Sequence, residues 1–255
     1  MDPLQSTPFV REALQELRKA VSHTDTAVLG FVGCPYTLAT YIVEGKSSKD
    51  YLVIKQMMYN EPQLLHSILQ HVTTQIAQYA IYQIESGAQL IQIFDSWAGH
   101  LSPHDYDTFA APYQKQILDT IKAKYPNVPT VMYIKHSGAL IERMAATGVD
   151  VVSLDWTVDM AMGRDRIDQG RLDGGIVTQE QYAKQLHRGG VQGNLDPAIL
   201  YAKDQSVIYD RTVEILQKAG RFGHVMNLGH GIEATTPEAN AAYFIETVRN
   251  YRHTD

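Results

Sequence analysis

Cysteine is nearly absent from this sequence: Cys34 is the one cysteine among 255 residues. A single thiol cannot close an internal disulfide or supply a zinc site made of several cysteines, which fits a reducing compartment. Basic residues are also outnumbered, with 22 Lys and Arg against 28 Asp and Glu and a formal net charge of −6. That balance argues against non-specific binding of nucleic acid, which requires a basic surface. An anionic ligand would need a local basic patch.

Long apolar runs are missing as well. No run approaches the roughly 18 uncharged residues of a membrane helix. The first five residues, Met-Asp-Pro-Leu-Gln, lack the basic and apolar regions of a signal peptide. We therefore expect neither membrane insertion nor secretion.

Six short apolar runs alternate with amphipathic stretches, which is the pattern of a parallel sheet wrapped by helices. Nearly continuous apolar runs are typical of strands that are buried on both faces. The predicted strands are Ala27–Gly33, Ala88–Ser96, Thr130–Lys135, Val149–Trp156, Val191–Asp196 and His224–His230. Between them, apolar residues recur every three or four positions, as in amphipathic helices. One such stripe consists of Leu65, Ile68, Val72, Ile76 and Tyr79.

The fold class is therefore α/β, and 255 residues suit a single domain, 1–255, of the size of a (β/α) barrel. A closed barrel of this type has eight parallel strands. With six predicted, we expect an incomplete TIM-type barrel whose edges are the first and sixth strands, with unpaired backbone groups that favour association. Residues 164–190 are polar and dotted with glycine, and we interpret them as a possible surface insertion with a helix near Gln179–His187.

The segment 30–45 (GFVGCPYTLATYIVEG) combines a strand end, a Gly/Pro turn and a short helix. Catalytic residues of (β/α) barrels lie where the strands end. Thr37 is predicted to cap the helix, and Tyr41, four residues on, shares its face. Considered alone, Tyr41 is a packed side chain with its hydroxyl group at the rim, and a ligand-binding phenol is the alternative.

Two other strand ends carry polar side chains. Asp95 and Ser96 end the second predicted strand and could bind a ligand, although such residues also cap turns through side-chain to backbone hydrogen bonds. His230 stands between two glycines at the end of the sixth strand. An exposed imidazole that titrates near neutrality can hold a carboxylate or move a proton. Asp95 and His100 are weaker candidates than Ser96 and His230.

These motifs resemble the active-site segments of uroporphyrinogen decarboxylases, enzymes of haem and chlorophyll biosynthesis that remove acetate carboxyl groups from a cyclic tetrapyrrole. Residues 148–159 (GVDVVSLDWTVD) and 191–197 (VQGNLDP) support the resemblance, which covers nearly the whole chain and is strongest to the cyanobacterial and plastid branch. It implies a TIM-type barrel and a lyase that converts uroporphyrinogen III to coproporphyrinogen III by releasing four carboxyl groups as CO2. It implies no metal and no organic cofactor, because the protonated pyrrole ring is the electron sink.

The resemblance assigns substrate binding to Tyr41, Ser96 and His230 and places Phe31 along the pocket. We expect the first three side chains to meet in one cleft. The family's Arg-x-x-x-Arg-type element and its catalytic Asp match no residue here, so no catalytic residue is assigned. The acids of the two further stretches, Asp155 among them, are expected to cap loops.

Lys135 and His136 follow the third predicted strand, where the family loop varies. They could supply local positive charge, but we interpret them as part of an exposed polar loop. The resemblance also implies a homodimer. It implies the cytoplasm of a bacterium or, in a photosynthetic eukaryote, the plastid stroma, and this chain carries no recognisable transit peptide.

Three alternatives stay open. A corrinoid-dependent methyltransferase of the same barrel family would hold zinc through Cys and His, and Cys34 has no His at ligand spacing. The second is a non-catalytic tetrapyrrole-binding or subunit-partner protein, and the third is a product begun at an internal Met1. Because the family Asp normally stabilises the protonated ring, we expect the chain alone to be a poor catalyst.

Overall fold

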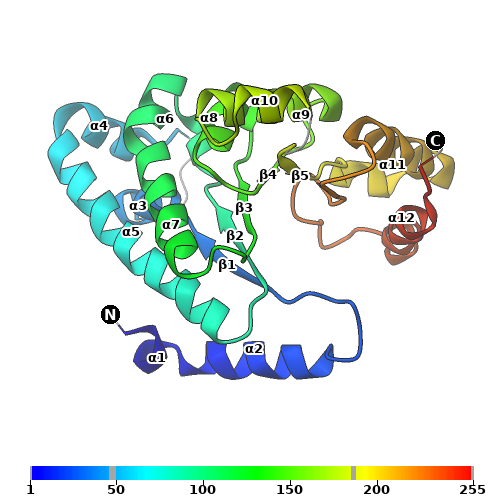
Figure 1. Ribbon diagram of the computed structural model, residues 1–255, viewed down its shortest axis with the longest axis horizontal. Helices are drawn as coiled ribbons and strands as arrows, with labels where there is room; N and C mark the ends of the chain where they lie inside the picture. Colours follow the sequence, from blue (N-terminus) through cyan, green and yellow to red (C-terminus); the bar gives the residue numbers. More distant parts are fainter. Residues whose placement is uncertain (1, 46–49, 185–187, 254–255) are drawn as a thin grey trace. The chain divides into compact units, whose positions relative to one another are not determined.

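The computed structural model describes residues 2–45, 50–184 and 188–253. The chain divides into two compact units, Met1–Tyr133 with Thr147–Val149 and Ile134–Ala146 with Asp150–Asp255. Each unit contains three parallel strands and the helices that connect them, which confirms the predicted α/β class. All six predicted strands are present, and each is shorter than its predicted range. Figure 1 labels β1 to β5 among the helices that connect them.

The first unit is built on strands β1 (Leu29–Gly33), β2 (Leu90–Phe94) and β3 (Thr130–Tyr133). They pair in parallel, with Phe31 opposite Gln92 and Ile91 opposite Thr130. The helices of this unit are α1 (Pro3–Ser6), α2 (Pro8–Ala20), α3 (Pro35–Glu44), α4 (Leu52–Asn60), α5 (Pro62–Glu85), η1 (Ala98–His100), α6 (Pro103–Phe109) and α7 (Ala111–Lys124). The parallel register brings the carboxyl ends of β1 and β2, and the loops that follow them, to one edge of this sheet.

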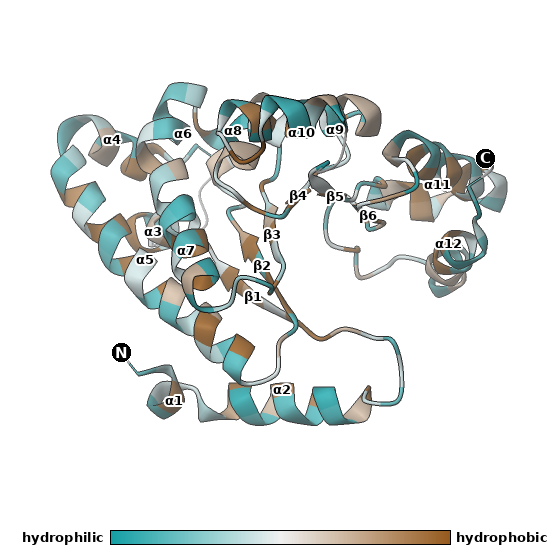
Figure 2. Cartoon of the chain, viewed as in Figure 1, coloured by the Kyte–Doolittle hydropathy of each residue, from teal (hydrophilic) through white to brown (hydrophobic). Residues whose placement is uncertain are grey.

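Helix α5 buries a slightly different face from the one predicted. Its buried side chains include one per turn, Leu65, Leu69, Thr73, Ile76 and Ala80, whereas Ile68, Val72 and Tyr79 are only half-buried. Figure 2 shows the interleaved hydrophilic and hydrophobic residues along this helix. The predicted stripe therefore marked the margin of the buried face as well as its centre.

Strand β1 pairs only with β2 among the described residues of this unit, but its outer edge is not bare. The side-chain oxygen of Gln83 on α5 accepts a hydrogen bond from the backbone N–H of Phe31 (3.0 Å), and the Gln83 amide nitrogen donates to the carbonyl of Phe31 (2.9 Å). The expectation of unpaired backbone groups along this edge is thus wrong at Phe31. A side-chain amide takes the two hydrogen bonds that a neighbouring strand would make.

The second unit contains strands β4 (Val151–Ser153), β5 (Gly190–Gln192) and β6 (His224–Val225), which also pair in parallel. Its helices are η2 (Ser137–Ala139), α8 (Ile141–Ala146), α9 (Met160–Asp173), α10 (Gln179–Ala183), η3 (Pro197–Tyr201), α11 (Gln205–Ala219) and α12 (Glu238–Asn250). Leu195, Leu200 on η3 and Ile208 on α11 form a buried apolar cluster.

The sixth strand departs most from its predicted range, His224–His230. After Val225 the ladder is interrupted, and a single parallel bridge joins Leu228 to Leu195. The Gly229 N–H then donates to the carbonyl of Leu195 at 2.7 Å. The chain therefore stays beside the segment that follows β5 as far as Gly229, without forming a regular strand.

The stretch 164–190 begins inside α9, where Arg164, Ile167 and Gly170 are buried. A Cβ at Gly170 would lie 2.3 Å from the carbonyl oxygen of Glu142, so α9 packs backbone to backbone against α8. The helix predicted near Gln179–His187 is α10, and residues 185–187 lie outside the described residues. That 164–190 is an insertion within a single domain stays a prediction.

Within the described ranges, none of the helices is both long and apolar enough to cross a bilayer.

Candidate functional site

The turn after β1 is held by a contact that its own sequence did not reveal. Helix α3 begins at Pro35 with Cys34 as its N-cap residue, so the prediction that Thr37 caps this helix is wrong. Instead, the backbone N–H and the hydroxyl group of Thr37 donate to Oδ1 of Asp95, at 3.0 and 2.7 Å. The loops that follow β1 and β2 are thereby fastened together.

Asp95 is the centre of a buried polar network. Its side chain is fully buried, and its Oδ2 accepts a hydrogen bond from the Gln114 side chain at 2.7 Å. Burial raises the pKa of this carboxyl group, although the hydrogen bonds from Thr37 and Gln114 act in the opposite direction. With its oxygens occupied by Thr37 and Gln114, Asp95 positions the loop in preference to contacting a ligand.

Three of the four predicted substrate-binding residues lie in the first unit. Tyr41 on α3 packs edge-to-face against Trp97, with ring centroids 5.9 Å apart, and Trp97 directly follows Ser96. Phe31 packs edge-to-face against Phe94 at 6.1 Å. Phe31 therefore lies within β1, and Tyr41 and Ser96 lie on the adjacent segments that follow β1 and β2.

The polar ends of these side chains are available. Tyr41 is 47% exposed and Ser96 is half-buried. Within the residues that the structure describes, neither hydroxyl group makes a hydrogen bond to protein. His100, a weaker candidate, instead contributes to the aromatic cluster, with its ring 4.3 Å from that of Tyr51 and 6.3 Å from that of Trp97.

In the second unit, Asp155 fixes the strand-end loops as predicted for the acids of its motif. The buried Asp155 carboxylate accepts hydrogen bonds from the backbone N–H groups of Ser137 (3.1 Å) and Thr157 (2.8 Å). The Asn194 side chain donates to the carbonyls of Asp155 and Val158, both at 2.7 Å. The loops that precede α8, follow β4 and follow β5 are therefore joined around one residue.

Trp156, next to Asp155, carries a cluster of basic side chains that includes the predicted His230. The His230 ring meets the Trp156 ring edge-to-face at 5.9 Å, and the His136 ring lies 6.1 Å away. The ammonium group of Lys135 lies 5.7 Å from the Trp156 ring centroid. A Cβ at Gly229 would lie 2.4 Å from the backbone nitrogen of Trp156, so glycine is required for the segment that carries His230 to approach this closely.

The sequence favours an exposed polar loop for Lys135 and His136 and does not single out Trp156. His136 is exposed, but Lys135 is only half-buried. The signal that could have found the cluster was the basic pair within three residues of the end of one strand, combined with an aromatic residue three residues after the end of the next strand. Both positions lie at carboxyl ends of parallel strands.

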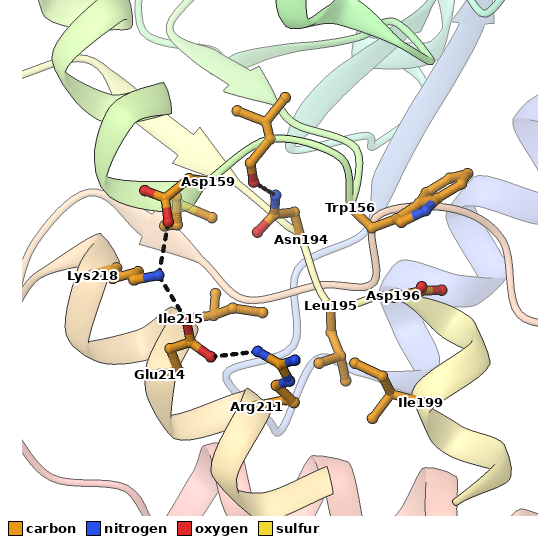
Figure 3. A pocket seen from close by; sticks show the side chains of 12 residues that line it. Trp156, Asp159, Asn194, Leu195, Asp196, Ile199, Arg211, Glu214, Ile215 and Lys218 are labelled. Atoms are coloured by element: carbon orange, nitrogen blue, oxygen red, sulfur yellow. Dashed lines mark hydrogen bonds and ion pairs between the residues drawn. The ribbon is translucent and has the colours of Figure 1, made fainter. Parts of the chain in front are cut away.

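A cavity of about 260 Å³ lies beside Trp156 in the same unit, bordered by the loops after β4 and β5 and by α11. Its cations are already paired: Lys218 contacts Asp159 and Glu214, both at 2.7 Å, and Arg211 contacts Glu214 at 3.0 Å (Figure 3). With its positive charges neutralised, this cavity is poorly suited to bind an additional carboxylate.

Phe31, Tyr41 and Ser96 belong to the first unit and His230 to the second. Their convergence on a single cleft stays a prediction. Among the described side chains, no group of three or more His, Cys, Asp or Glu is arranged to hold a metal ion.

Comparison with known proteins gives a family match over residues 1–251, to the family described as uroporphyrinogen decarboxylase (URO-D). Curated relatives named uroporphyrinogen decarboxylase are 49% identical in a Picosynechococcus species and 51% identical in Prochlorococcus marinus and in a Synechococcus species. Each alignment covers 98% of this chain, and the chain spans 65%, 66% and 63% of the three relatives, just under two thirds of their length.

Among solved structures, a methyltransferase from Methanosarcina mazei superposes with a TM-score of 0.77 at 22% identity. The superposition covers 97% of this chain and 66% of the methyltransferase. At that identity the likeness concerns the fold alone.

Proposed function

Because the chain belongs to the uroporphyrinogen decarboxylase family, we propose that it converts uroporphyrinogen III to coproporphyrinogen III, as a carboxy-lyase of tetrapyrrole biosynthesis. The observation that carries this proposal is the identity of about 50% to curated uroporphyrinogen decarboxylases, sustained over 98% of the chain. The family match over residues 1–251 includes all three strand-end motifs. The fold alone would not carry the proposal, because one barrel architecture supports many reactions.

The proposed reaction breaks the bond between an acetate methylene carbon and its carboxylate carbon. CO2 leaves, and the electron pair of the broken bond moves into a pyrrole ring that has been protonated on carbon. Protonation of the methylene carbon and loss of the ring proton then give a methyl group. The protein has to hold the carboxylates in place and stabilise the positive charge of the protonated ring.

We propose that Tyr41, Ser96 and His230 bind substrate carboxylates and that Phe31 lines the pocket. Support comes from the available hydroxyl groups of Tyr41 and Ser96 and from the exposed His230 beside Trp156. Hydrogen bonds from such donors to a carboxylate are charge-assisted and stronger than neutral ones. None of the four residues can stabilise the protonated ring as a fixed negative charge, so we expect slow turnover by the chain alone.

The setting of this activity is also a proposal. We infer a homodimer that acts on a tetrapyrrole, within a single domain over residues 1–255. The cytoplasm of a bacterium fits the cyanobacterial relatives, and the plastid stroma is the corresponding compartment of a photosynthetic eukaryote.

The test is an anaerobic assay in which coproporphyrinogen formed from uroporphyrinogen is measured by chromatography after oxidation. We expect product from the purified chain, and at least tenfold less from the variants Tyr41→Phe, Ser96→Ala and His230→Gln. Tyr209→Phe is the matched control, because Tyr209 on α11 is 48% exposed, as Tyr41 is 47% exposed. The control should retain full activity.

Two outcomes would contradict the proposal. Tight binding of uroporphyrinogen without any product would identify a non-catalytic tetrapyrrole-binding protein. Neither binding nor product would exclude a role in this reaction for the chain alone.

A further inference from the structure

We propose that Lys135 binds a side-chain carboxylate of the substrate, as a cation of the same subsite as His230, with both groups beside the Trp156 ring. This inference rests on the proposed function and extends it by naming a residue to which no role is assigned. The subsite would supply the local positive charge that a chain with a net charge of −6 needs in order to bind a polyanion.

Lys135 and His230 both lie beside the ring of Trp156. The Lys135 ammonium and the His230 imidazole both lie within 6 Å of the Trp156 ring centroid, at 5.7 and 5.9 Å. Trp156 is half-buried, so part of its side chain is accessible to a ligand. An aromatic surface flanked by two donors matches a pyrrole ring that carries carboxylates on adjacent carbons.

The positive charge of Lys135 is not neutralised by an ion pair with any described residue. Among the residues that the structure describes, no carboxylate forms an ion pair with Lys135, whose recorded contact is with the Trp156 ring. A cation over an aromatic face keeps its N–H groups free for an anion. By contrast, Lys218 is held by Asp159 and Glu214 in the neighbouring cavity (Figure 3).

Asp155, directly before Trp156 in the sequence, is the acid that could most readily neutralise Lys135. The Asp155 carboxylate is turned into the loop and accepts hydrogen bonds from the backbone of Ser137 and from Thr157. It therefore does not neutralise Lys135 by a direct contact. The same hydrogen bonds hold the segment that carries Lys135 beside the segment that carries Trp156, so the subsite is preorganised.

Backbone contacts of Gly229 fix the segment that carries His230. The Gly229 N–H donates to the carbonyl of Leu195. The Gly229 backbone lies against the backbone nitrogen of Trp156, with no room for a Cβ. Backbone contacts thus fix the segment that carries His230, and the hydrogen bond from Ser137 to Asp155 fixes the segment that carries Lys135. A purely structural interaction between Lys135 and Trp156 would not require His230 to be fixed there as well.

The experiment measures anaerobic binding of uroporphyrinogen, with eight carboxylates, and of coproporphyrinogen, with four, by equilibrium dialysis at low and high salt. For Lys135→Gln we expect a Kd for uroporphyrinogen that is five- to tenfold higher than that of the unmodified chain, and a weaker dependence on salt. Lys135→Arg should bind within threefold of the unmodified chain, because it keeps the charge. Lys218→Gln is the matched control, a cation of the same unit that is already paired, and should leave Kd within twofold.

Two results separate this inference from the proposed function. If the unmodified chain binds and decarboxylates uroporphyrinogen and Lys135→Gln does the same with unchanged Kd and salt dependence, the inference is overturned and the function stands. If the unmodified chain binds neither tetrapyrrole, both are overturned.

A second measurement covers the case in which the variants do not fold. Acetylation of lysines in the unmodified protein is followed by mass spectrometry with and without uroporphyrinogen. We expect saturating ligand to lower the acetylation rate of Lys135 at least threefold and to leave Lys203 and Lys218 unchanged. Equal rates for Lys135 in both samples would refute the subsite.

Discussion

Replacing Asp95 by alanine should destabilise the first unit more than the loss of a typical carboxylate does. The substitution removes three side-chain hydrogen bonds of 2.7–3.0 Å and leaves the buried donors of Thr37 and Gln114 without an acceptor. A buried donor without a partner costs about 1–3 kcal/mol. Relief from burying a carboxylate, whose pKa is raised by that burial, offsets part of the loss. We expect a net loss of about 3–5 kcal/mol in the free energy of unfolding.

Asp119→Ala is the matched control for this prediction. Asp119 lies in the same unit, in an exposed pair with Lys115 four residues before it on α7, so its loss should cost about 0.5 kcal/mol or less. Urea unfolding followed by tryptophan fluorescence measures both variants, because Trp97 lies on the loop that Asp95 holds. If Asp95→Ala unfolds within 1 kcal/mol of the unmodified chain, the network around Asp95 does not carry the loop.

Two further perturbations concern the second unit. Gly229→Ala should lower the thermal unfolding midpoint and weaken tetrapyrrole binding, because the new Cβ would lie 2.4 Å from the backbone nitrogen of Trp156. Gly231→Ala is the control and should leave both unchanged, because no atom lies within 4 Å of its Cβ; equal midpoints for the two variants would contradict this prediction. Burial lowers the pKa of His224, whose Nε2 lies 2.7 Å from the carbonyl oxygen of Gly193, so its contribution to stability is present above the ordinary value of 6.5 and is lost as the pH falls through the lower folded pKa. Urea midpoints measured between pH 7.5 and 5 should therefore decline less steeply in His224→Gln, and parallel profiles would show that another group titrates.

The sequence was most informative about which segments are buried and least informative about where strands end. Ile134, Leu154 and Leu195 are fully buried, yet they lie beyond the last residues of β3, β4 and β5. An apolar run therefore measured exclusion from water, which continues where regular strand pairing gives way to an isolated bridge at Leu195 and a backbone hydrogen bond from the Leu154 N–H to the carbonyl of Gln192 (2.9 Å). Because burial and strand pairing are separate properties, the six strands were located correctly and each was made too long.

The candidate site divides along the same line. The loop-capping role of Asp155 was predictable, because its partner Thr157 lies two residues away and such local contacts have sequence signatures. The hydrogen bond from Thr37 to Asp95 was not predictable, because the two residues are 58 positions apart in the sequence. Thr37 makes this distant contact and does not cap the helix that contains it. The contact between Lys135 and Trp156 likewise joins two loops that only the parallel order of the strands brings together.

The side-chain amide of Gln83 protects the outer edge of β1 from pairing with another strand unless that strand arrives in the correct register. A strand arriving there must displace the carboxamide from Phe31, and it brings an N–H and a C=O of its own, so the exchange conserves the number of hydrogen bonds. Only an arrangement that places an acceptor and a donor opposite Phe31 recovers both bonds, and any slipped arrangement leaves one of them unmade. Gln83 thereby makes chance adhesion at this edge slow while leaving a correctly aligned strand almost no thermodynamic obstacle.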